Sequence, residues 1–299
     1  MEEVHMYDVI IIGAGPAGLT VAIYAARGGK NVLVLGDKFD SQLAMSGRIE
    51  NYPGFEGEGM ELLIKMEEQA KKWGTKVVTS RVLDIVYEDE IFKIETKDEH
   101  FNGKVVVIAT GAHPRKLNIP GEEQLLHRGV SYCAVCDGAL FRERRVFVLG
   151  YGNGAAKAAY YLSNFSQVKV LCTKKRLRAE AIYLRELEKR GVEVLTGVHP
   201  IEILGDEVVK ELCYSIEGNE IKELVDGIFI EAGSLPNNDL ASKLGLELDD
   251  KGFIKVDSDC RTSMDHVFAC GDITGGVRQV ASAVGEGAIV GVRMGARDL

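Results

Sequence analysis

Apolar residues along this chain form short continuous runs that alternate with stretches of helical periodicity. The first run, Tyr7–Ile12, is apolar apart from Asp8 and rich in isoleucine, as is typical of a strand buried on both faces of a parallel sheet. A helical pattern with a face of small residues follows over Pro16–Gly28, and Asn31–Leu35 is the next apolar run. Strand, glycine-rich turn, helix and strand in this order predict a βαβ unit at the start of the chain.

The same succession predicts a second βαβ unit in the middle of the chain. Arg145–Leu149 has the pattern of a buried strand, Asn153–Ser163 that of a helix and Val168–Leu171 that of the next strand. The remaining patterns predict strands over residues 76–80, 81–87, 91–96, 103–109, 225–230 and 266–269, and helices over residues 60–73, 180–190 and 277–293. Strands 81–87 and 91–96 resemble an antiparallel addition to the first sheet. The predicted fold class is therefore α/β.

Proline and glycine mark two places where the chain passes between domains. Pro114, Pro120 and Gly121 form the first linker, and residues 235–238 form the second. The segment after the second linker has no glycine-rich turn of the βαβ kind, so it most simply completes the first domain. We expect two Rossmann-like dinucleotide-binding domains, the second inserted into the first: a discontinuous domain of residues 1–112 and 241–299, and an inserted domain of residues 113–240.

Composition narrows the class of protein. The 299 residues are 46% hydrophobic and include 34 glycines, which fits a soluble α/β protein with sizeable cores. The net charge of −9 argues against a nucleic-acid partner. The uncharged run Val9–Ala26 has the length of a membrane helix, but its glycines and Pro16 interrupt it, and the acidic start Met1-Glu2-Glu3 is unlike a secretory signal. We therefore expect a cytoplasmic protein without membrane association.

The two glycine-rich turns have the fingerprint of dinucleotide binding. They read Gly13-Ala14-Gly15-Pro16-Ala17-Gly18 and Gly150-Tyr151-Gly152-Asn153-Gly154-Ala155. Glycine lets the backbone approach a pyrophosphate, and the helix that follows offers its free N–H groups. The candidate nucleotide-binding residues are Gly13, Gly15, Pro16, Ala17 and Gly18 in the first turn, and Gly150, Gly152, Asn153 and Ala155 in the second. The alternative for each turn is a glycine-rich packing turn without a ligand.

The residues after the second strand of each unit normally contact the ribose. In the first unit these are Gly36 and Asp37, and Asp37 can accept hydrogen bonds from ribose hydroxyls. In the second unit the segment Cys172–Arg178 contains four cations and no carboxylate. Because cations pair with a 2′-phosphate and an acid would favour NAD, Lys174 and Arg178 are candidates for NADPH binding. An ordinary solvated run of charge is the alternative.

Six cysteines are too few for a secreted disulfide scaffold, and two of them form a Cys133-x-x-Cys136 pair. Because no second pair completes a zinc site, we expect no metal and a redox-active disulfide instead. Asp137 follows directly and is a candidate proton carrier, or alternatively a helix-capping or turn acid. We expect Cys172, Cys213, Cys260 and Cys270 to be small apolar core residues. A disulfide in a chain with two dinucleotide turns suggests an electron path from nicotinamide through flavin and disulfide to a partner protein.

These residues resemble the low-molecular-weight thioredoxin reductases, which are pyridine-nucleotide disulfide oxidoreductases, over essentially the whole chain. The resemblance rests on both glycine turns, Gln42-Leu43, Glu50-Asn51-Tyr52-Pro53-Gly54, Ala109-Thr110-Gly111-Ala112, Cys133-Ala134-Val135-Cys136-Asp137-Gly138, Gly271-Asp272 and Arg278-Gln279-Val280. The position of the cysteine pair inside the second nucleotide domain is specific to this family.

The resemblance implies a homodimer that binds FAD and reduces thioredoxin. Asp272 would contact the ribitol of FAD, and Arg278, Gln279 and Val280 would line the isoalloxazine. The further FAD-site residues would be Gly36, Asp37, Gln42, Leu43, Asn51, Thr110, Gly111 and Gly271. Cys136 would face the flavin, Cys133 would attack the thioredoxin disulfide and Asp137 would act as acid and base. The family also implies that the inserted domain rotates.

The chain departs from the family pattern at two places. NADPH-using members have His-Arg-Arg-x-x-x-Arg after the second strand, and the corresponding residues here are Cys172, Thr173, Lys174 and Arg178. Since Lys and Thr do not replace the bidentate guanidinium, we expect weak binding of NADPH, still preferred over NADH. The family's Gly-Gly-Gln is Asp40-Ser41-Gln42 here, which changes a loop near the flavin. A reductase fed by ferredoxin, a flavin-dependent dithiol oxidase and a non-catalytic redox-sensing flavoprotein are the alternative functions.

Overall fold

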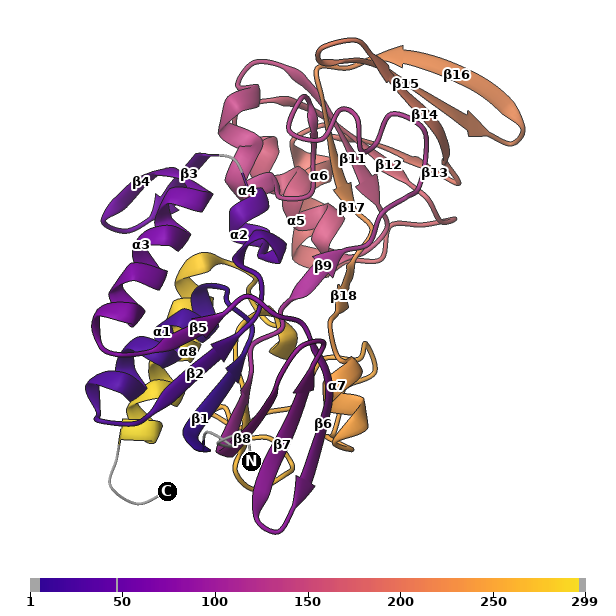
Figure 1. Ribbon diagram of the computed structural model, residues 1–299. Coiled ribbons are helices and arrows are strands. Elements are labelled where there is room, and N and C mark those ends of the chain that lie inside the picture. Colours follow the sequence, from indigo (N-terminus) through magenta and orange to yellow (C-terminus); the bar gives the residue numbers. More distant parts are fainter. Residues whose placement is uncertain (1–5, 47, 296–299) are drawn as a thin grey trace. The chain divides into compact units, whose positions relative to one another are not determined.

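The computed structural model describes residues 6–46 and 48–295 of the chain, so the acidic start Met1-Glu2-Glu3 lies outside the described residues. The chain divides into two compact units (Figure 1). Unit 1 consists of Met1–His113 and Leu235–Leu299, and unit 2 consists of Pro114–Ser234. Both units contain parallel strands and helices, which confirms the α/β class.

Unit 1 is built on a mainly parallel sheet. The strands run in the order β5 (Lys76–Val78), β2 (Val32–Leu35), β1 (Met6–Ile12) and β8 (His100–Ile108), and β19 (Val267–Ala269) also pairs with β8. The predicted antiparallel addition is confirmed: β6 (Val82–Glu88) pairs with β7 (Ile91–Thr96), and β7 pairs with β8. The sheet is therefore open, with the parallel strands β1 and β8 at its centre.

The apolar side chains of β1 contribute to two hydrophobic cores, one on each face of the sheet. Ile11 packs with the helices α1 (Pro16–Arg27), α3 (Gly59–Lys72) and α8 (Val280–Gly295). Ile10 belongs to the opposite core, which includes residues of β6, β7 and α7 (Asp239–Lys243). Each fully buried side chain of this size contributes about 1.5–3 kcal/mol. The isoleucine-rich pattern therefore identifies a strand that is buried on both faces, as the sequence predicts.

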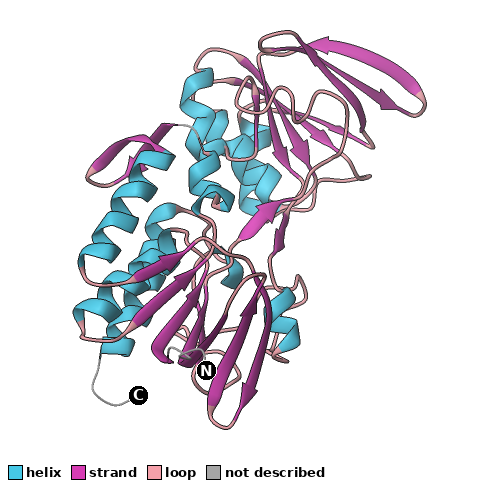
Figure 2. Cartoon of the chain, in the orientation of Figure 1, coloured by secondary structure: helices cyan, strands magenta, loops and turns pink. Residues whose placement is uncertain are grey.

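Unit 2 repeats this arrangement on a smaller scale (Figure 2). Its parallel sheet has the order β10 (Val130–Ser131), β17 (Gly227–Glu231), β11 (Arg145–Gly150), β12 (Gln167–Cys172) and β13 (Glu193–Thr196). The helices α5 (Asn153–Leu162) and α6 (Ala181–Lys189) pack on one face. The other face packs against β14 (His199–Gly205) and β15 (Val209–Ile216). The largely exposed strand β16 (Asn219–Leu224) completes this antiparallel sheet by pairing with β15.

The chain crosses between the units through two short paired strands, β9 (Ala112–Pro114) and β18 (Ser234–Pro236). Just after β18, the backbone N–H of Asn237 donates to the Gly111 carbonyl at 3.0 Å, and the Asn237 side chain donates to the Thr110 carbonyl at 2.7 Å. These bonds bring the chain back to unit 1 at residue 235, whereas the sequence-based boundary is residue 241.

The structure contains several short elements that the hydrophobic pattern of the sequence does not predict. The hairpin β3 (Arg48–Tyr52) and β4 (Phe55–Glu58) and the single-turn helices η1 (Lys38–Asp40), α2 (Gln42–Met45) and η3 (Asp272–Thr274) have no clear hydrophobic period. Helix α8 begins at Val280 and not at Val277, because the Ser282 hydroxyl holds the preceding segment by donating to the Gln279 carbonyl at 2.9 Å. In the described part of the chain, no helix combines the length and the apolar character needed to cross a membrane.

Candidate active site

The first glycine turn lies where β1 ends and α1 begins, and its backbone leaves no room for side chains. Gly13 has φ +123°, and a Cβ at this position would lie 2.1 Å from the Ala109 carbonyl oxygen. A Cβ on Gly18 would lie 2.0 Å from the Gly13 carbonyl oxygen. Only glycine therefore permits the close approach of β1, α1 and the end of β8.

The start of α1 fits an anionic ligand. Gly15 is the N-cap, no side-chain hydrogen bond caps this described helix, and no acidic residue lies in its first turn, where Pro16 stands. Its first N–H groups therefore remain available to a pyrophosphate. Gly36 and Asp37 follow β2, the strand beside β1, so they reach the same carboxyl edge of the sheet. One oxygen of Asp37 accepts the Phe39 N–H at 2.9 Å and caps η1.

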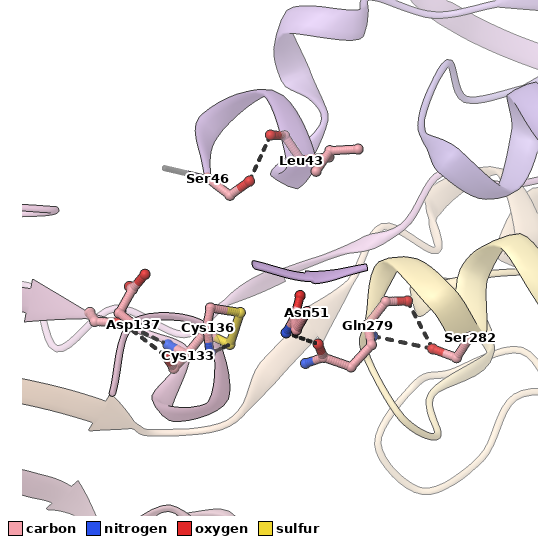
Figure 3. Close-up of a disulfide and its surroundings, with 9 residues drawn as sticks. Leu43, Ser46, Asn51, Cys133, Cys136, Asp137, Gln279 and Ser282 are labelled. Atoms are coloured by element: carbon pink, nitrogen blue, oxygen red, sulfur yellow. Dashed lines mark hydrogen bonds between the residues drawn. A yellow bond between two sulfur atoms is a disulfide. The ribbon is translucent and has the colours of Figure 1, made fainter. Parts of the chain in front are cut away.

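The other FAD-site candidates of unit 1 are joined by hydrogen bonds. The Gln42 side chain donates to Asp272 Oδ2 at 3.1 Å and to the Ala112 carbonyl. The next residue in the sequence, Leu43, is buried. Asn51 donates to Gln279 Oε1 at 3.1 Å, and Figure 3 shows these two side chains directed toward each other. Segments distant in the sequence therefore converge at one edge of the unit 1 sheet.

Among these residues, Asp272 is the acid whose pKa is raised. The pKa of Asp272 is raised to about 6, mainly by burial; Arg278 and Gln42 oppose this rise, and Glu286 adds to it. Glu286 also fixes the turn, because its Oε2 accepts the Gly271 N–H at 2.7 Å and the Thr274 hydroxyl at 3.1 Å. Asp272 can therefore exchange hydrogen bonds with a hydroxyl-bearing ligand in either protonation state. Sequence reasoning did not identify Glu286, because no motif spacing connects it with Gly271.

The cysteine pair lies in unit 2, where Cys133 and Cys136 form a disulfide with a Cα–Cα distance of 5.3 Å (Figure 3). Cys133 is the N-cap of α4 (Ala134–Asp137), and its Sγ accepts the N–H of Cys136 at 3.2 Å. This N–H would stabilise a thiolate on Cys133 once the disulfide is reduced. The four other cysteines are buried and free, as the sequence predicts. Burial raises the pKa of Cys260 to about 11, so this thiol is unreactive.

Asp137 is connected to the cysteine pair through Ser131, a residue to which the sequence gave no role. The Ser131 hydroxyl donates to Asp137 Oδ2 at 2.6 Å and accepts the Cys133 N–H at 3.0 Å. Asp137 stands at the N-cap position of η2 (Gly138–Phe141), yet no side-chain capping bond of this described turn comes from it. Its carboxylate faces Ser131 instead, which disfavours the capping alternative.

The second glycine turn joins β11 to α5 and is close-packed at Gly150 but open at Gly152. A Cβ on Gly150 would lie 2.6 Å from the Glu231 carbonyl oxygen, whereas a Cβ on Gly152 would meet nothing within 4 Å. Ala155 is fully buried under the turn. The Asn153 amide donates to the Glu180 carboxylate at 2.7 Å and accepts the Glu180 N–H at 2.8 Å. This side chain therefore connects the start of α5 with the segment before α6.

The basic segment after β12 folds back over this turn. The Arg178 N–H donates to the Tyr151 carbonyl at 2.8 Å, and Lys174 Nζ lies 5.8 Å from the centre of the Tyr151 ring. The side chains of Lys174, Lys175, Arg176 and Arg178 are exposed, and among the described residues none of them forms an ion pair. The structure therefore gathers exposed positive charge beside the second turn. No cluster of three or more metal-ligating side chains occurs in residues 6–46 and 48–295.

Comparisons with known proteins agree with this arrangement. The profile of the family described as pyridine nucleotide-disulphide oxidoreductase matches residues 7–287. The thioredoxin reductase of Listeria monocytogenes is 36% identical over 297 residues, which cover 97% of this chain and 93% of that protein. The crystal structure of thioredoxin reductase from Streptococcus pyogenes is 36% identical with a TM-score of 0.88 and 97% coverage of both chains. The thioredoxin reductase structure from Giardia duodenalis is 30% identical with a TM-score of 0.89, covering 97% of this chain and 98% of that one.

Proposed function

Because the chain belongs to the pyridine nucleotide-disulphide oxidoreductase family, and within it to the thioredoxin reductases, we propose that it reduces the disulfide of a thioredoxin. Electrons would pass from a reductant through FAD and the Cys133–Cys136 pair to this partner. The observation that carries the proposal is the Cys133–Cys136 disulfide, with Asp137 bonded beside it, in a chain that has two dinucleotide turns. A homodimer and a reducing, cytoplasmic environment belong to the same proposal.

FAD fits the residues of unit 1. The turn from Gly13 to Gly18 and the uncapped start of α1 would hold the pyrophosphate, with Pro16 and Ala17 in the first turn of the helix. The residues that would contact the rest of the cofactor are Gly36, Asp37, Gln42, Leu43, Asn51, Thr110, Gly111, Gly271, Asp272, Arg278, Gln279 and Val280. When bound, FAD takes two electrons from the donor and supplies them to the disulfide.

The cysteine pair and Asp137 carry out the disulfide exchange. Two electrons and two protons break the Cys133–Cys136 bond and leave two thiols, with Cys136 as the sulfur that faces the flavin. Asp137 takes the proton of Cys133, whose thiolate attacks one sulfur of the partner disulfide. The partner disulfide breaks, a mixed disulfide forms, and the leaving partner thiolate takes the proton from Asp137. Cys136 loses its proton and displaces the partner from Cys133, which restores the original disulfide and releases the second partner thiolate for protonation.

The second glycine turn and the basic segment support NADPH as the donor. Gly150 and Gly152 would leave space for the pyrophosphate, and Lys174 and Arg178 would attract the 2′-phosphate. We propose that NADPH is preferred over NADH and is bound weakly, since the segment lacks a pair of adjacent guanidinium groups.

Replacement of Cys136 tests the proposed function. The purified protein is expected to be yellow and to reduce thioredoxin, whereas Cys136→Ser should abolish this reduction and leave the flavin reducible by dithionite. Cys213→Ala, which removes a buried free thiol of the same unit, is the matched control. Unchanged thioredoxin turnover in Cys136→Ser would refute the proposal. Peroxide formation with a small dithiol and no activity with thioredoxin would identify a dithiol oxidase, and bound FAD without any turnover would identify a sensor.

A further inference from the structure

Ser131 lies at the end of β10, two residues before Cys133, and its side chain is buried with a relative exposure of 3%. Its hydroxyl donates to Asp137 Oδ2 at 2.6 Å, and its oxygen accepts the Cys133 N–H at 3.0 Å. One hydroxyl therefore links the main chain of the first redox cysteine with the carboxyl group that follows the second.

The same hydroxyl has a second acceptor, because the Cys133 carbonyl oxygen lies 3.3 Å from Ser131 Oγ. A serine hydroxyl has one proton and two lone pairs, so it donates to only one of the two acceptors at a time. While Asp137 is charged, the shorter and charge-assisted bond to Oδ2 takes the proton. After Asp137 takes up a proton, the carboxyl can donate to Ser131 Oγ, whose own proton then turns to the Cys133 carbonyl.

Other titratable groups around α4 are engaged elsewhere or make no described contact with Asp137. Lys157, Tyr160 and Tyr161 are the titratable residues of α5, the helix packed on α4. Lys157 pairs with Glu180 at 3.6 Å, and the two tyrosine rings pack on Tyr183 and Phe165. Beyond η2, Arg142 lies over the Phe165 ring.

Tyr132, which follows Ser131 in the sequence, donates to the buried Glu122 at 2.7 Å and not to Asp137. Among the described residues, Ser131 makes the hydrogen bond to the Asp137 carboxyl group, while the Asp137 main-chain N–H donates to the Cys133 carbonyl at 3.1 Å.

We propose that Ser131 is the positioning residue for Asp137, and that rotation of its hydroxyl holds this carboxyl group beside the cysteine pair in both protonation states. The inference rests on the proposed function, in which Asp137 exchanges a proton with Cys133. Ser131 takes no part in electron transfer and loses no proton. Its role is to keep the proton carrier in place while the charge on the carrier changes.

The test is Ser131→Ala in the flavin-containing protein, with thioredoxin as the oxidant and dithionite as the reductant. Loss of a hydrogen bond to a charged group favours the protonated carboxyl, so the acid limb of the pH–kcat profile should move up by about one pH unit. Because the carboxyl group is no longer held beside Cys133, the plateau of kcat should in addition fall about tenfold, while KM for thioredoxin stays within about twofold. Ser131→Thr retains the hydroxyl and should restore both the profile and kcat. Ser166→Ala removes another hydroxyl of unit 2, which donates to the Phe141 carbonyl at 2.7 Å, and should leave the profile unchanged.

The variants distinguish this inference from the proposed function. Because Ser131 acts through Asp137, adding Ser131→Ala to Asp137→Asn should change kcat by less than about twofold. A lower kcat with an unshifted profile, or an equal loss in the Asp137→Asn background, would overturn the role of Ser131 alone. Wild-type kinetics of Asp137→Asn would remove Asp137 from the mechanism and overturn this inference, while the proposed function, which Cys136→Ser tests, would stand. If Ser131→Ala folds poorly, the isosteric pair Ser131→Thr and Ser131→Val repeats the comparison, and equal profiles of the two refute the inference.

Discussion

Asp272 shows how burial can dominate the pKa of a single residue. Its folded-state pKa of about 6 lies above the ordinary value of 3.8, so between these values the folded chain binds more protons than the unfolded chain. The stability of the flavin-free protein should therefore fall as the pH rises from about 4 to about 6, by up to about 3 kcal/mol. Stabilisation is greatest below the lower value, where both states are protonated.

Asp272→Asn should remove this pH dependence. The flavin-free variant should be more stable than the parent at pH 7, by about 1–3 kcal/mol, and nearly equal to it near pH 4. Urea unfolding at both pH values measures the difference. Asp98→Asn, at an exposed acid in the turn before β8, is the control and should change neither value. If Asp272→Asn keeps the slope of the parent, burial of this carboxyl does not cause it. The variant should also bind FAD more weakly, since Asp272 belongs to the proposed FAD site.

Residues of the candidate site could be proposed from the sequence where a motif fixes their spacing. The glycines of both turns, the cysteine pair and Asp272 belong to local patterns that reflect backbone geometry or chemistry. Ser131, Glu286 and Asn237 act by hydrogen bonds that depend on the folded chain. A serine two residues before a cysteine predicts no particular contact from the sequence. Ser131 can bond to Asp137 only because α4 directs the Asp137 carboxyl group back toward β10.

At the scale of elements, the contact of α1 with α8 depends on glycines of α8. A Cβ on Gly291 would lie 2.5 Å from the Cβ of Tyr24, and one on Gly287 would lie 2.5 Å from the Ala17 carbonyl oxygen. Gly285, in the same helix, would meet nothing within 4 Å. The helix therefore contains glycines that packing requires and at least one that it does not.

Two alanine variants of α8 should consequently have opposite effects on stability. Gly291→Ala forces the helices apart and should cost about 1–3 kcal/mol. Gly285→Ala should stabilise the protein by about 0.5–1 kcal/mol, because alanine favours the helix and has open space there. Thermal unfolding of both variants, each with its flavin content measured, compares them. Equal effects of the two substitutions would show that helix propensity, and not the contact with α1, decides.

The elements predicted well are those with a long apolar pattern. Strand β1 and helix α1 are buried almost throughout, so their sequences have a continuous signal. The hairpin β3–β4 alternates between intermediate and exposed positions in β4, so its pattern hardly differs from that of a loop. Strand β5 ends at Val78 rather than at Ser80 because the Ser80 N–H turns back to the Val78 carbonyl at 3.0 Å. Such ends depend on single hydrogen bonds that hydrophobicity does not encode.

At the scale of the whole molecule, the recurrence of a βαβ unit supports the proposal of two nucleotide sites, the second of which would serve the electron donor. Lys174 and Arg178 remain exposed and unpaired among the described residues, and the Tyr151 ring lies beneath Lys174. This charge attracts a 2′-phosphate, but without the fork geometry of adjacent arginines the attraction is mostly Coulombic. Binding of NADPH should therefore weaken steeply as salt is added.

Charge removal tests this assignment. Lys174→Ala combined with Arg178→Ala should lower the preference for NADPH over NADH about tenfold or more, while thioredoxin reduction driven by dithionite stays intact. Lys189→Ala combined with Lys222→Ala removes two exposed cations elsewhere in unit 2 and should leave the preference unchanged. Anaerobic stopped-flow reduction of the flavin by NADPH, NADH and reduced ferredoxin measures the preference directly. No flavin bleaching at millimolar NADPH, together with rapid bleaching by ferredoxin, would assign the donor to an iron–sulfur protein. The proposed disulfide exchange at Cys133 and Cys136 would not be contradicted by that outcome, because reduction driven by dithionite needs no nucleotide at the second glycine turn.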